Sequence, residues 1–236
     1  MRGVVAGLAI LLSLGALGVA AAPASAATHE CDGLTVCVPV AGPWVVVPTG
    51  RRAPLPHVEY QLSCPRGYVV GGLDAELSDR AIDIGFAAKL GSPVNPGITT
   101  SRAAVFTATY VGASAVAPSF RPHIGCMPAT GGGRRIPTAA VVAPGQPTVR
   151  HVRTVRLRTG HTQGIAQGCA SGERLVGGSH AVGFFGQRPP SATVAHSVTA
   201  TQSFALDHVT VVARAGAAAL GAHAAVQVSA ICAGGR

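Results

Sequence analysis

Arginine is the side chain whose type and spacing most clearly suggest chemistry in this sequence. A series of closely spaced arginines comprises Arg150, Arg153, Arg156 and Arg158. Arg134 and Arg135 extend this series toward the N-terminus. Guanidinium groups bind phosphate and carboxylate, as found in teichoic acid, nucleic acid and anionic lipid. A solvated strand face would use the same residues without a ligand, so both interpretations stay open. Base stacking on a nucleic acid is disfavoured because aromatic side chains are nearly absent from this stretch.

The nine histidines suggest a metal site. Six of them fall within residues 148–236: His151, His161, His180, His196, His208 and His223. None forms an H-x-H pair or an H-E-x-x-H motif, and the only carboxylates nearby are Glu173 and Asp207. We therefore expect exposed or hydrogen-bonded imidazoles and no cofactor. Strand pairing could still gather distant imidazoles around zinc or copper, so a metal site remains the alternative.

A hydrolase would need a nucleophile with its base, or two carboxylates. The chain has no G-x-S-x-G motif, and Ser179 and His180 are adjacent, so a strand would point them to opposite faces. Paired carboxylates could come only from the acidic cluster, which comprises Asp74, Glu76, Asp79 and Asp83. Asp74 and Glu76 share a strand face if that strand continues past Gly72. We expect these carboxylates to lie in turns, with a secreted hydrolase as the alternative function.

The six cysteines occur in a pattern that repeats. Cys64 is followed by Gly67 and then by Gly71-Gly72, and Cys169 is followed by Gly172 and then by Gly177-Gly178. The closing cysteines, Cys126 and Cys232, lie 62 and 63 residues after the opening ones. The spacing predicts disulfides Cys64–Cys126 and Cys169–Cys232, which leaves Cys31–Cys37 as the third pair.

The glycines and the loop lengths make further predictions about the two copies. Gly67 and Gly172 should permit a turn, and each Gly-Gly pair should allow a bulge or a close backbone contact. Adding 106 maps Ala103–Phe106 onto Val209–Val212 and Cys126 onto Cys232. Equal loop lengths predict the same strand order in both copies, because a one-residue slip would turn a strand inside out.

Alternating apolar residues predict the strands that carry these side chains. Residues 82–90 have apolar side chains at every second position, and residues 103–111, 119–127 and 148–159 also favour strands. Val155 and Leu157 should share one face, with Arg156 and Arg158 on the other. Within residues 36–47 we expect one or two short strands interrupted by Gly42-Pro43, and we interpret Trp44 as a core or interdomain plug. One more short strand is expected at 138–143.

The N-terminus predicts export. Arg2 precedes an apolar segment that ends at Ala24-Ser25-Ala26, the pattern of a signal peptide cleaved before Ala27; an uncleaved membrane anchor is the alternative. The mature chain would be basic only in its second part, where ten arginines follow Pro128 against Glu173 and Asp207. We expect a signal peptide at 1–26, a lead-in without a counterpart at 27–56, a first β unit at 57–128, a linker at 129–147 and a second β unit at 148–236.

The Cys-x-x-Gly, Gly-Gly and closing Cys pattern resembles modules repeated in secreted proteins of high-GC Gram-positive bacteria. The resemblance covers residues 57–128 and 148–236. It implies an exported, disulfide-closed β-sandwich-like unit, and it carries over no catalytic residue. We therefore predict an all-β protein of two tandem homologous antiparallel β-sandwich-like units. The expected function is non-catalytic binding or a structural role, with a basic face of the second unit contacting an anionic cell-wall polymer or a membrane surface.

Overall fold

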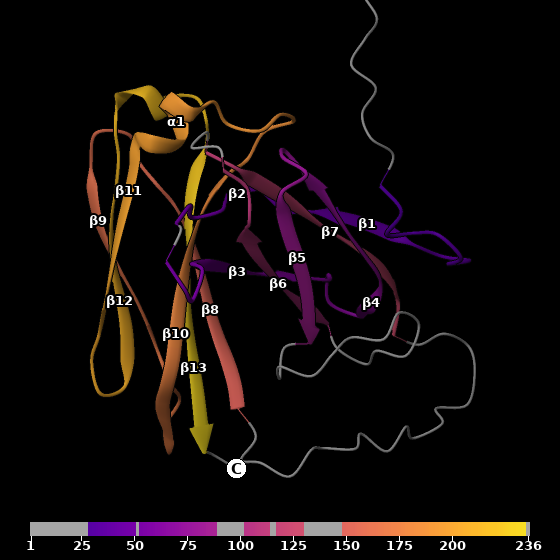
Figure 1. Ribbon diagram of the computed structural model, residues 1–236. Helices are drawn as coiled ribbons and strands as arrows, with labels where there is room; N and C mark the ends of the chain where they lie inside the picture. The colour runs from indigo at the N-terminus through magenta and orange to yellow at the C-terminus, as the bar shows by residue number, and fades with distance from the viewer. Residues whose placement is uncertain (1–27, 51, 89–101, 114–116, 130–147, 235–236) are drawn as a thin grey trace, which may run out of the picture.

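A computed structural model describes residues 28–50, 52–88, 102–113, 117–129 and 148–234. Within these ranges the chain forms thirteen β-strands, one five-residue α-helix and one 3-10 turn, and the strand pairs are antiparallel apart from one isolated parallel bridge (Figure 1). The predicted all-β fold is therefore confirmed. We call residues 28–129 the first unit and residues 148–234 the second unit.

The first unit packs a three-stranded sheet onto strands of a larger sheet. Its strands are β1 (Val38–Ala41), β2 (Trp44–Val46), β3 (His57–Ser63), β4 (Tyr68–Leu77), β5 (Ile82–Ala88), β6 (Ala103–Tyr110) and β7 (Ser119–Pro128). The small sheet has the order β3-β6-β5, while β4, β1 and β2 all pair with β7. Phe106 of β6 and Phe120 and Ile124 of β7 are fully buried between the two layers. This core holds the first unit together as a sandwich.

The second unit has a similar two-layer arrangement. Its elements are β8 (Thr148–Arg156), β9 (Thr162–Gly168), β10 (Glu173–Phe184), α1 (Ala192–His196), β11 (Val198–Phe204), β12 (His208–Ala215), η1 (Ala217–Ala219) and β13 (Ala224–Gly234). The small sheet is β11-β12-β9, and β13 lies between β10 and β8. Val209 and Val211 of β12 are buried against Val226 and Val228 of β13. Short aliphatic side chains thus fill this core where the first unit uses phenylalanines.

The strand pairings correct two expectations about which residues of the two units correspond. Val38 in β1 pairs with Cys126, as Val149 in β8 pairs with Cys232, so the lead-in does have a counterpart in the second unit. Ser63 pairs with Ala103 and Gly168 pairs with His208, so β6 and β12 correspond with an offset of 105 rather than 106. The extra residue of the second unit therefore lies between β12 and β13, and Phe106 corresponds to Val211.

The strand β2 joins the two units. Val45 pairs with Phe120 of β7 on one edge and with Gly183 of β10 on the other, which makes one sheet with the order β1-β7-β2-β10-β13-β8. Trp44 pairs with Phe184 and is buried, as expected for a plug between units. In Figure 1 the first unit, in purple, leans against the strands of the second unit, in orange and yellow.

All three predicted disulfides are present: Cys31–Cys37, Cys64–Cys126 and Cys169–Cys232. Gly67 and Gly172 both have a φ of +84°, in agreement with the predicted turns. The two Gly-Gly pairs do not occupy equivalent positions in β4 and β10, however. The bulge falls at Gly71 in β4 but at Val176 in β10, because Val70 and Leu175 are the residues that pair with the closing cysteines.

The other predicted strands are found with small shifts at their ends. The expected strands at 36–47, 82–90, 103–111, 119–127 and 148–159 correspond to β1 with β2, β5, β6, β7 and β8. The strands β3, β9 and β11 were not predicted. The small and polar residues of β9 and β11 do not alternate clearly, whereas the alternation in β3 was overlooked. The signal peptide, the linker strand at 138–143, Arg134 and Arg135 all lie outside the described residues.

Candidate functional site between the two units

The predicted arginine series does not form one basic face. In β8, Arg150, Thr154 and Arg156 lie on one face and Arg153 lies on the opposite face, because side chains alternate along a strand. Arg150 is not a free surface group. Its Nη1 atom donates to Glu59 Oε2 at 2.8 Å and to Ser229 Oγ at 2.8 Å, and only 11% of the side chain is exposed. The prediction of Arg150 as a surface binding residue is therefore wrong.

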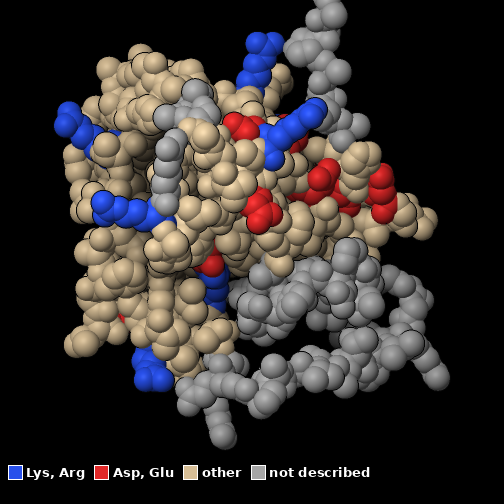
Figure 2. All heavy atoms as spheres, viewed as in Figure 1, with Lys and Arg blue, Asp and Glu red and all other residues tan. Residues whose placement is uncertain are grey.

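The three other arginines of the series are exposed but separate. Arg153 donates to the backbone oxygen of Ala166 at 3.4 Å, and the guanidinium of Arg156 lies 5.3 Å from the centre of the Phe185 ring. Val155 and Leu157 pack against the core of the second unit, as predicted, so Arg156 and Arg158 project from the other face. On the face shown in Figure 2 the basic side chains are scattered, while acidic side chains gather on the first unit.

The strand β3 connects the two units through one side chain and through its backbone. Val58 and Tyr60 point into the core of the first unit, whereas the side chain of Glu59 and the backbone of Gln61 bond to residues of the second unit. Gln227 accepts from the backbone N–H of Gln61 at 2.6 Å and donates to its carbonyl at 3.0 Å. This buried amide thus binds the backbone of β3 much as a neighbouring strand would.

Glu59 lies at the centre of this contact. Its Oε2 atom accepts from Arg150 and, at 3.0 Å, from the hydroxyl of Ser179. Burial alone would raise the pKa of Glu59, but the hydrogen bond and charge of Arg150, with the Ser179 hydroxyl, outweigh burial and hold this pKa below its ordinary value. Glu59 is therefore ionised at neutral pH and fixed in an interunit ion pair.

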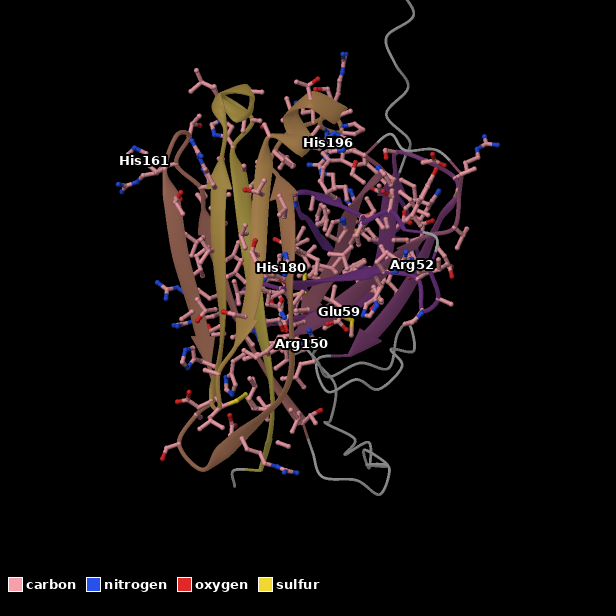
Figure 3. The ribbon with its side chains drawn as sticks, turned by 60° about the vertical axis from the view of Figure 1, so that its left-hand side comes forward. Arg52, Glu59, Arg150, His161, His180 and His196 are labelled. Carbon is pink, nitrogen blue, oxygen red and sulfur yellow. A yellow bond between two sulfur atoms is a disulfide. The ribbon has the colours of Figure 1, made fainter. Side chains whose placement is uncertain are left out.

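A cavity of about 460 Å³ opens beside this contact. Both units line it: Val46, Pro48, His57 and Val58 come from the first unit, and Gly178, Ser179, His180, Ala181, Val182, Ala195, Val198, Ala200 and Gln202 come from the second. Its walls are mostly apolar, with a few polar groups that converge on the space, which is the composition of a ligand site. In Figure 3, His180, Glu59 and Arg150 lie along the border between the units, whereas His161 lies at the far side of the second unit.

Gln202 fixes the polar groups of the cavity wall. Its Nε2 atom donates to the backbone oxygen of Gly178 at 3.2 Å, so its Oε1 atom accepts from His180 Nδ1 at 2.8 Å. His180 Nδ1 is therefore the donor in this contact, and Nε2 is left for a contact with a ligand. The cavity wall therefore offers hydrogen-bonding groups in fixed positions. The neighbouring Glu59–Arg150 pair adds no net charge to it.

Sequence reasoning missed most of this site. It considered His180 for a metal and Ser179 for a nucleophile, but it did not single out His57, Glu59, Gln61 or Gln202. The alternation in residues 57–62 could have revealed part of the site, because Val58, Tyr60 and Leu62 are apolar and the residues between them are polar. Such alternation predicts a strand with a second, polar face that needs a partner.

The structure does not bring the histidines into a metal site among the described residues. The one group of three ligand-type side chains that lies close together is His151, Glu173 and Cys232, but the Cys232 sulfur is bonded to Cys169. His151 instead donates to Glu173 at 2.6 Å. The backbone N–H of Ala170 and this imidazole hold the pKa of Glu173 below its ordinary value. The pair is thus explained as a local hydrogen-bonded contact.

Only Asp79 of the acidic cluster lies in a turn as expected, because Asp74 and Glu76 lie in β4 and Asp83 lies in β5. Asp74 and Glu76 do share a face of β4, as predicted. Asp74 accepts from the backbone of His29 and Ala75, both at 2.7 Å, and Asp79 accepts from Ala81 and Tyr110.

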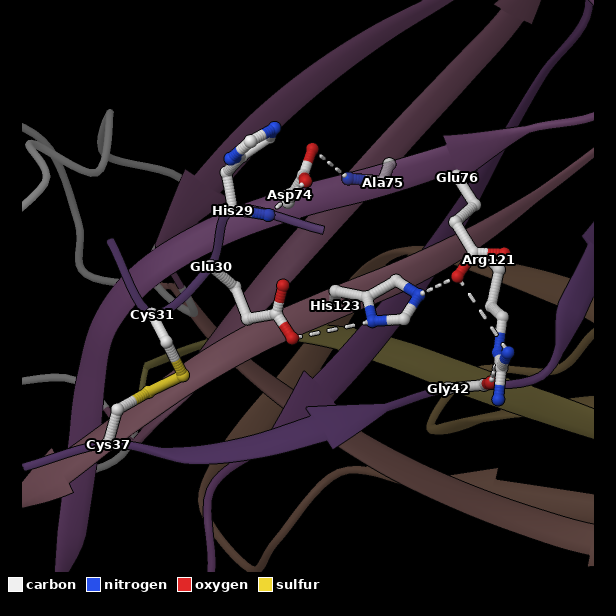
Figure 4. A network of polar contacts seen from close by, with 10 residues as sticks. All are labelled: His29, Glu30, Cys31, Cys37, Gly42, Asp74, Ala75, Glu76, Arg121 and His123. Atoms are coloured by element: carbon white, nitrogen blue, oxygen red, sulfur yellow. Dashed lines mark hydrogen bonds and ion pairs between the residues drawn. A yellow bond between two sulfur atoms is a disulfide. The ribbon is translucent and has the colours of Figure 1, made fainter. Parts of the chain in front are cut away.

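Glu76 belongs to the network drawn in Figure 4. Glu76 Oε1 lies 3.1 Å from His123 Nε2, and Glu30 Oε1 lies 3.7 Å from His123 Nδ1. Glu30 and His123 are both buried, and the backbone of Glu30 passes directly over Gly72 and Gly125. These carboxylates therefore fasten the segment that carries the Cys31–Cys37 disulfide onto the outer face of β4 and β7.

Comparisons with known proteins give no relative. No protein-family model, curated protein or solved structure matches this chain. The resemblance to secreted modules noted from the cysteine pattern stays an expectation. In the described part of the chain, no helix is long and apolar enough to cross a membrane.

Proposed function

We propose that the protein is a secreted, non-catalytic binding protein of the cell envelope that takes its ligand in the cavity between the two units. Export is supported by the signal-peptide pattern before Ala27 and by the three disulfides, which form in oxidising compartments. The observation that carries the proposal is the cavity itself, because two units contribute to its wall and His180 and Gln202 offer fixed hydrogen-bonding groups there.

The arrangement around Ser179 favours binding over the hydrolase alternative. A serine nucleophile needs a base that can take its proton. The Ser179 hydroxyl donates to Glu59, whose carboxylate is already ion-paired with Arg150 and has a lowered pKa. A carboxylate held ionised in this way is a weak base, so Ser179 is better suited to orient Glu59 than to attack a substrate.

Association with an anionic polymer through exposed arginine is a second candidate. It is favoured by the second unit, whose described residues include seven arginines against Glu173 and Asp207. Arg156 and Arg158 are both exposed and project from the same face. Contacts of this kind are screened by salt, whereas binding within a partly buried cavity is screened much less. The two candidates therefore differ in their salt dependence.

Cosedimentation with isolated Gram-positive cell walls, at low and at high salt, tests both candidates. We expect the mature protein to sediment with the walls at both salt concentrations and to lose this binding in Ala200→Trp, which fills the cavity. Thr201→Trp is the matched control, because Thr201 is exposed on the other face of β11. Binding that disappears at high salt and in Arg156→Ser/Arg158→Ser would favour the arginine face. Absence of binding at both salt concentrations would refute the envelope function.

A further inference from the structure

One edge of β10 is open where it borders the cavity. On its other edge β10 pairs with β13 from Glu173 to Phe184, but on this edge it pairs with β2 only at Gly183 and Phe184 within the described residues. Five consecutive residues of β10, from Gly178 to Val182, line the cavity. Because successive side chains point to opposite faces, a space that five consecutive residues touch must lie along the strand edge. This stretch is about 16 Å long at 3.3 Å per residue.

The backbone of this edge is available for hydrogen bonds. The side chain of Gln202 donates to the carbonyl of Gly178, which therefore points away from β13. Backbone groups alternate between the two edges of a strand, so His180 and Val182 also turn their N–H and C=O toward the cavity. The pairing of Phe184 with Trp44 on the same edge agrees with this alternation. Gln202 satisfies one of these groups with a side-chain amide, as a backbone amide of another strand would.

This edge also lacks the features that normally prevent strand addition. Charged side chains and proline keep sheet edges from pairing with other chains. The corresponding strand of the first unit, β4, carries Asp74 and Glu76, whereas the matching positions of β10 are Ser179 and Ala181. No charged residue and no proline occurs between Leu175 and Phe184.

We propose that the cavity binds an extended, uncharged peptide segment of another molecule, which adds to the β10 edge as an antiparallel strand in line with β2. This inference names the ligand class of the proposed function and rests on the cavity being its site. Direction and register follow from β2, which already pairs antiparallel with the last two residues of β10 and ends at Val46. Specificity would come from apolar contacts with Val182 and Val198 in the cavity wall and from hydrogen bonds to His180. The absence of a net charge in the wall matches an uncharged peptide.

Titration of the isotope-labelled mature protein with acetyl-Val-Thr-Val-Thr-Val-Thr-amide, followed by NMR, tests this inference. We expect a Kd below about 1 mM, with amide shifts at Gly178, His180 and Val182 and none at Gly67. A paired strand uses only alternate residues for its bonds to one neighbour. One peptide N-methylated at residues 1, 3 and 5 and another at residues 2, 4 and 6 should therefore differ, one losing binding at least about tenfold and the other retaining it.

Equal behaviour of the two methylated peptides, or no binding of the parent peptide, would overturn strand addition. Ala200→Trp should lose binding and Thr201→Trp should keep it. Concentration-dependent dimerisation of the protein alone that Ala200→Trp abolishes would overturn the inference in favour of a second copy as the occupant. Cell-wall binding that depends on Ala200 without peptide binding would leave the proposed function standing and refute only the ligand class. Peptide binding without cell-wall binding would refute the envelope function and leave the peptide site standing.

Discussion

Removing the positive charge of Arg150 should destabilise the contact between the two units. Arg150→Met keeps most of the side-chain volume but leaves the carboxylate of Glu59, only 19% exposed, without its ion-pair partner. Breaking a fully buried pair on one side costs about 3 to 5 kcal/mol. Because both side chains retain some exposure, we expect a loss of about 2 to 3 kcal/mol in the free energy of unfolding.

A double-mutant cycle isolates the pair. Glu59→Gln in the Arg150→Met background removes the uncompensated charge, and the amide oxygen can still accept from Ser179. We therefore expect the double variant to recover about 1 to 2 kcal/mol relative to Arg150→Met. Urea unfolding is the suitable assay, since guanidinium chloride would itself screen the charges. Additive effects of the two substitutions, or a loss below about 0.5 kcal/mol for Arg150→Met, would show that the pair does not hold the units together.

Three further predictions concern pH, the glycine contacts and the disulfides. The pKa of Glu59 is lower in the folded state than in the unfolded state. The stability that Glu59 contributes is therefore fully present above its unfolded-state pKa and is lost as the pH falls through its folded-state pKa. In urea titrations, the difference in stability between wild type and Glu59→Gln should shrink between about pH 6 and pH 3. Gly125→Ala would place a Cβ against the carbonyl of Glu30 and should lower the free energy of unfolding in urea by about 1 to 3 kcal/mol. Gly164→Ala adds its Cβ in open space and should change this free energy by less than about 0.5 kcal/mol. Equal effects of the two substitutions would contradict the close approach of Glu30 to Gly125. Replacing Cys169 and Cys232 by Ala opens a loop of 63 residues and should lower the free energy of unfolding by about 4 kcal/mol. Replacing Cys31 and Cys37, which are six residues apart, should lower it by about 2 kcal/mol. A larger drop in the thermal unfolding temperature for the Cys31 and Cys37 variant would contradict this order.

Some parts of the fold could be predicted because they depend on local sequence. The alternation in residues 82–90 and in residues 155–158 gave the correct faces of β5 and β8 where the structure describes their side chains, since a strand repeats every two residues whatever lies next to it. The positive φ of Gly67 and Gly172 follows from a turn that each unit makes after its cysteine. The offset in residue number between corresponding strands of the two units was harder to predict. The single extra residue between β12 and β13 does not change the composition of the strands, so the offset of 106 assigned to β12 was wrong by one.

The sequence by itself determined the all-β class, the three disulfides and most strand positions, because pattern, spacing and turn residues act over short distances. The tertiary structure alone decided what the side chains do. Arg150 looks like a member of a basic surface series in the sequence, yet its charge is used by Glu59, 91 residues earlier. The cavity beside it exists only because β3 of one unit crosses the sheet of the other. Contacts between segments so far apart depend on how the two sandwiches pack, and no local pattern contains that information.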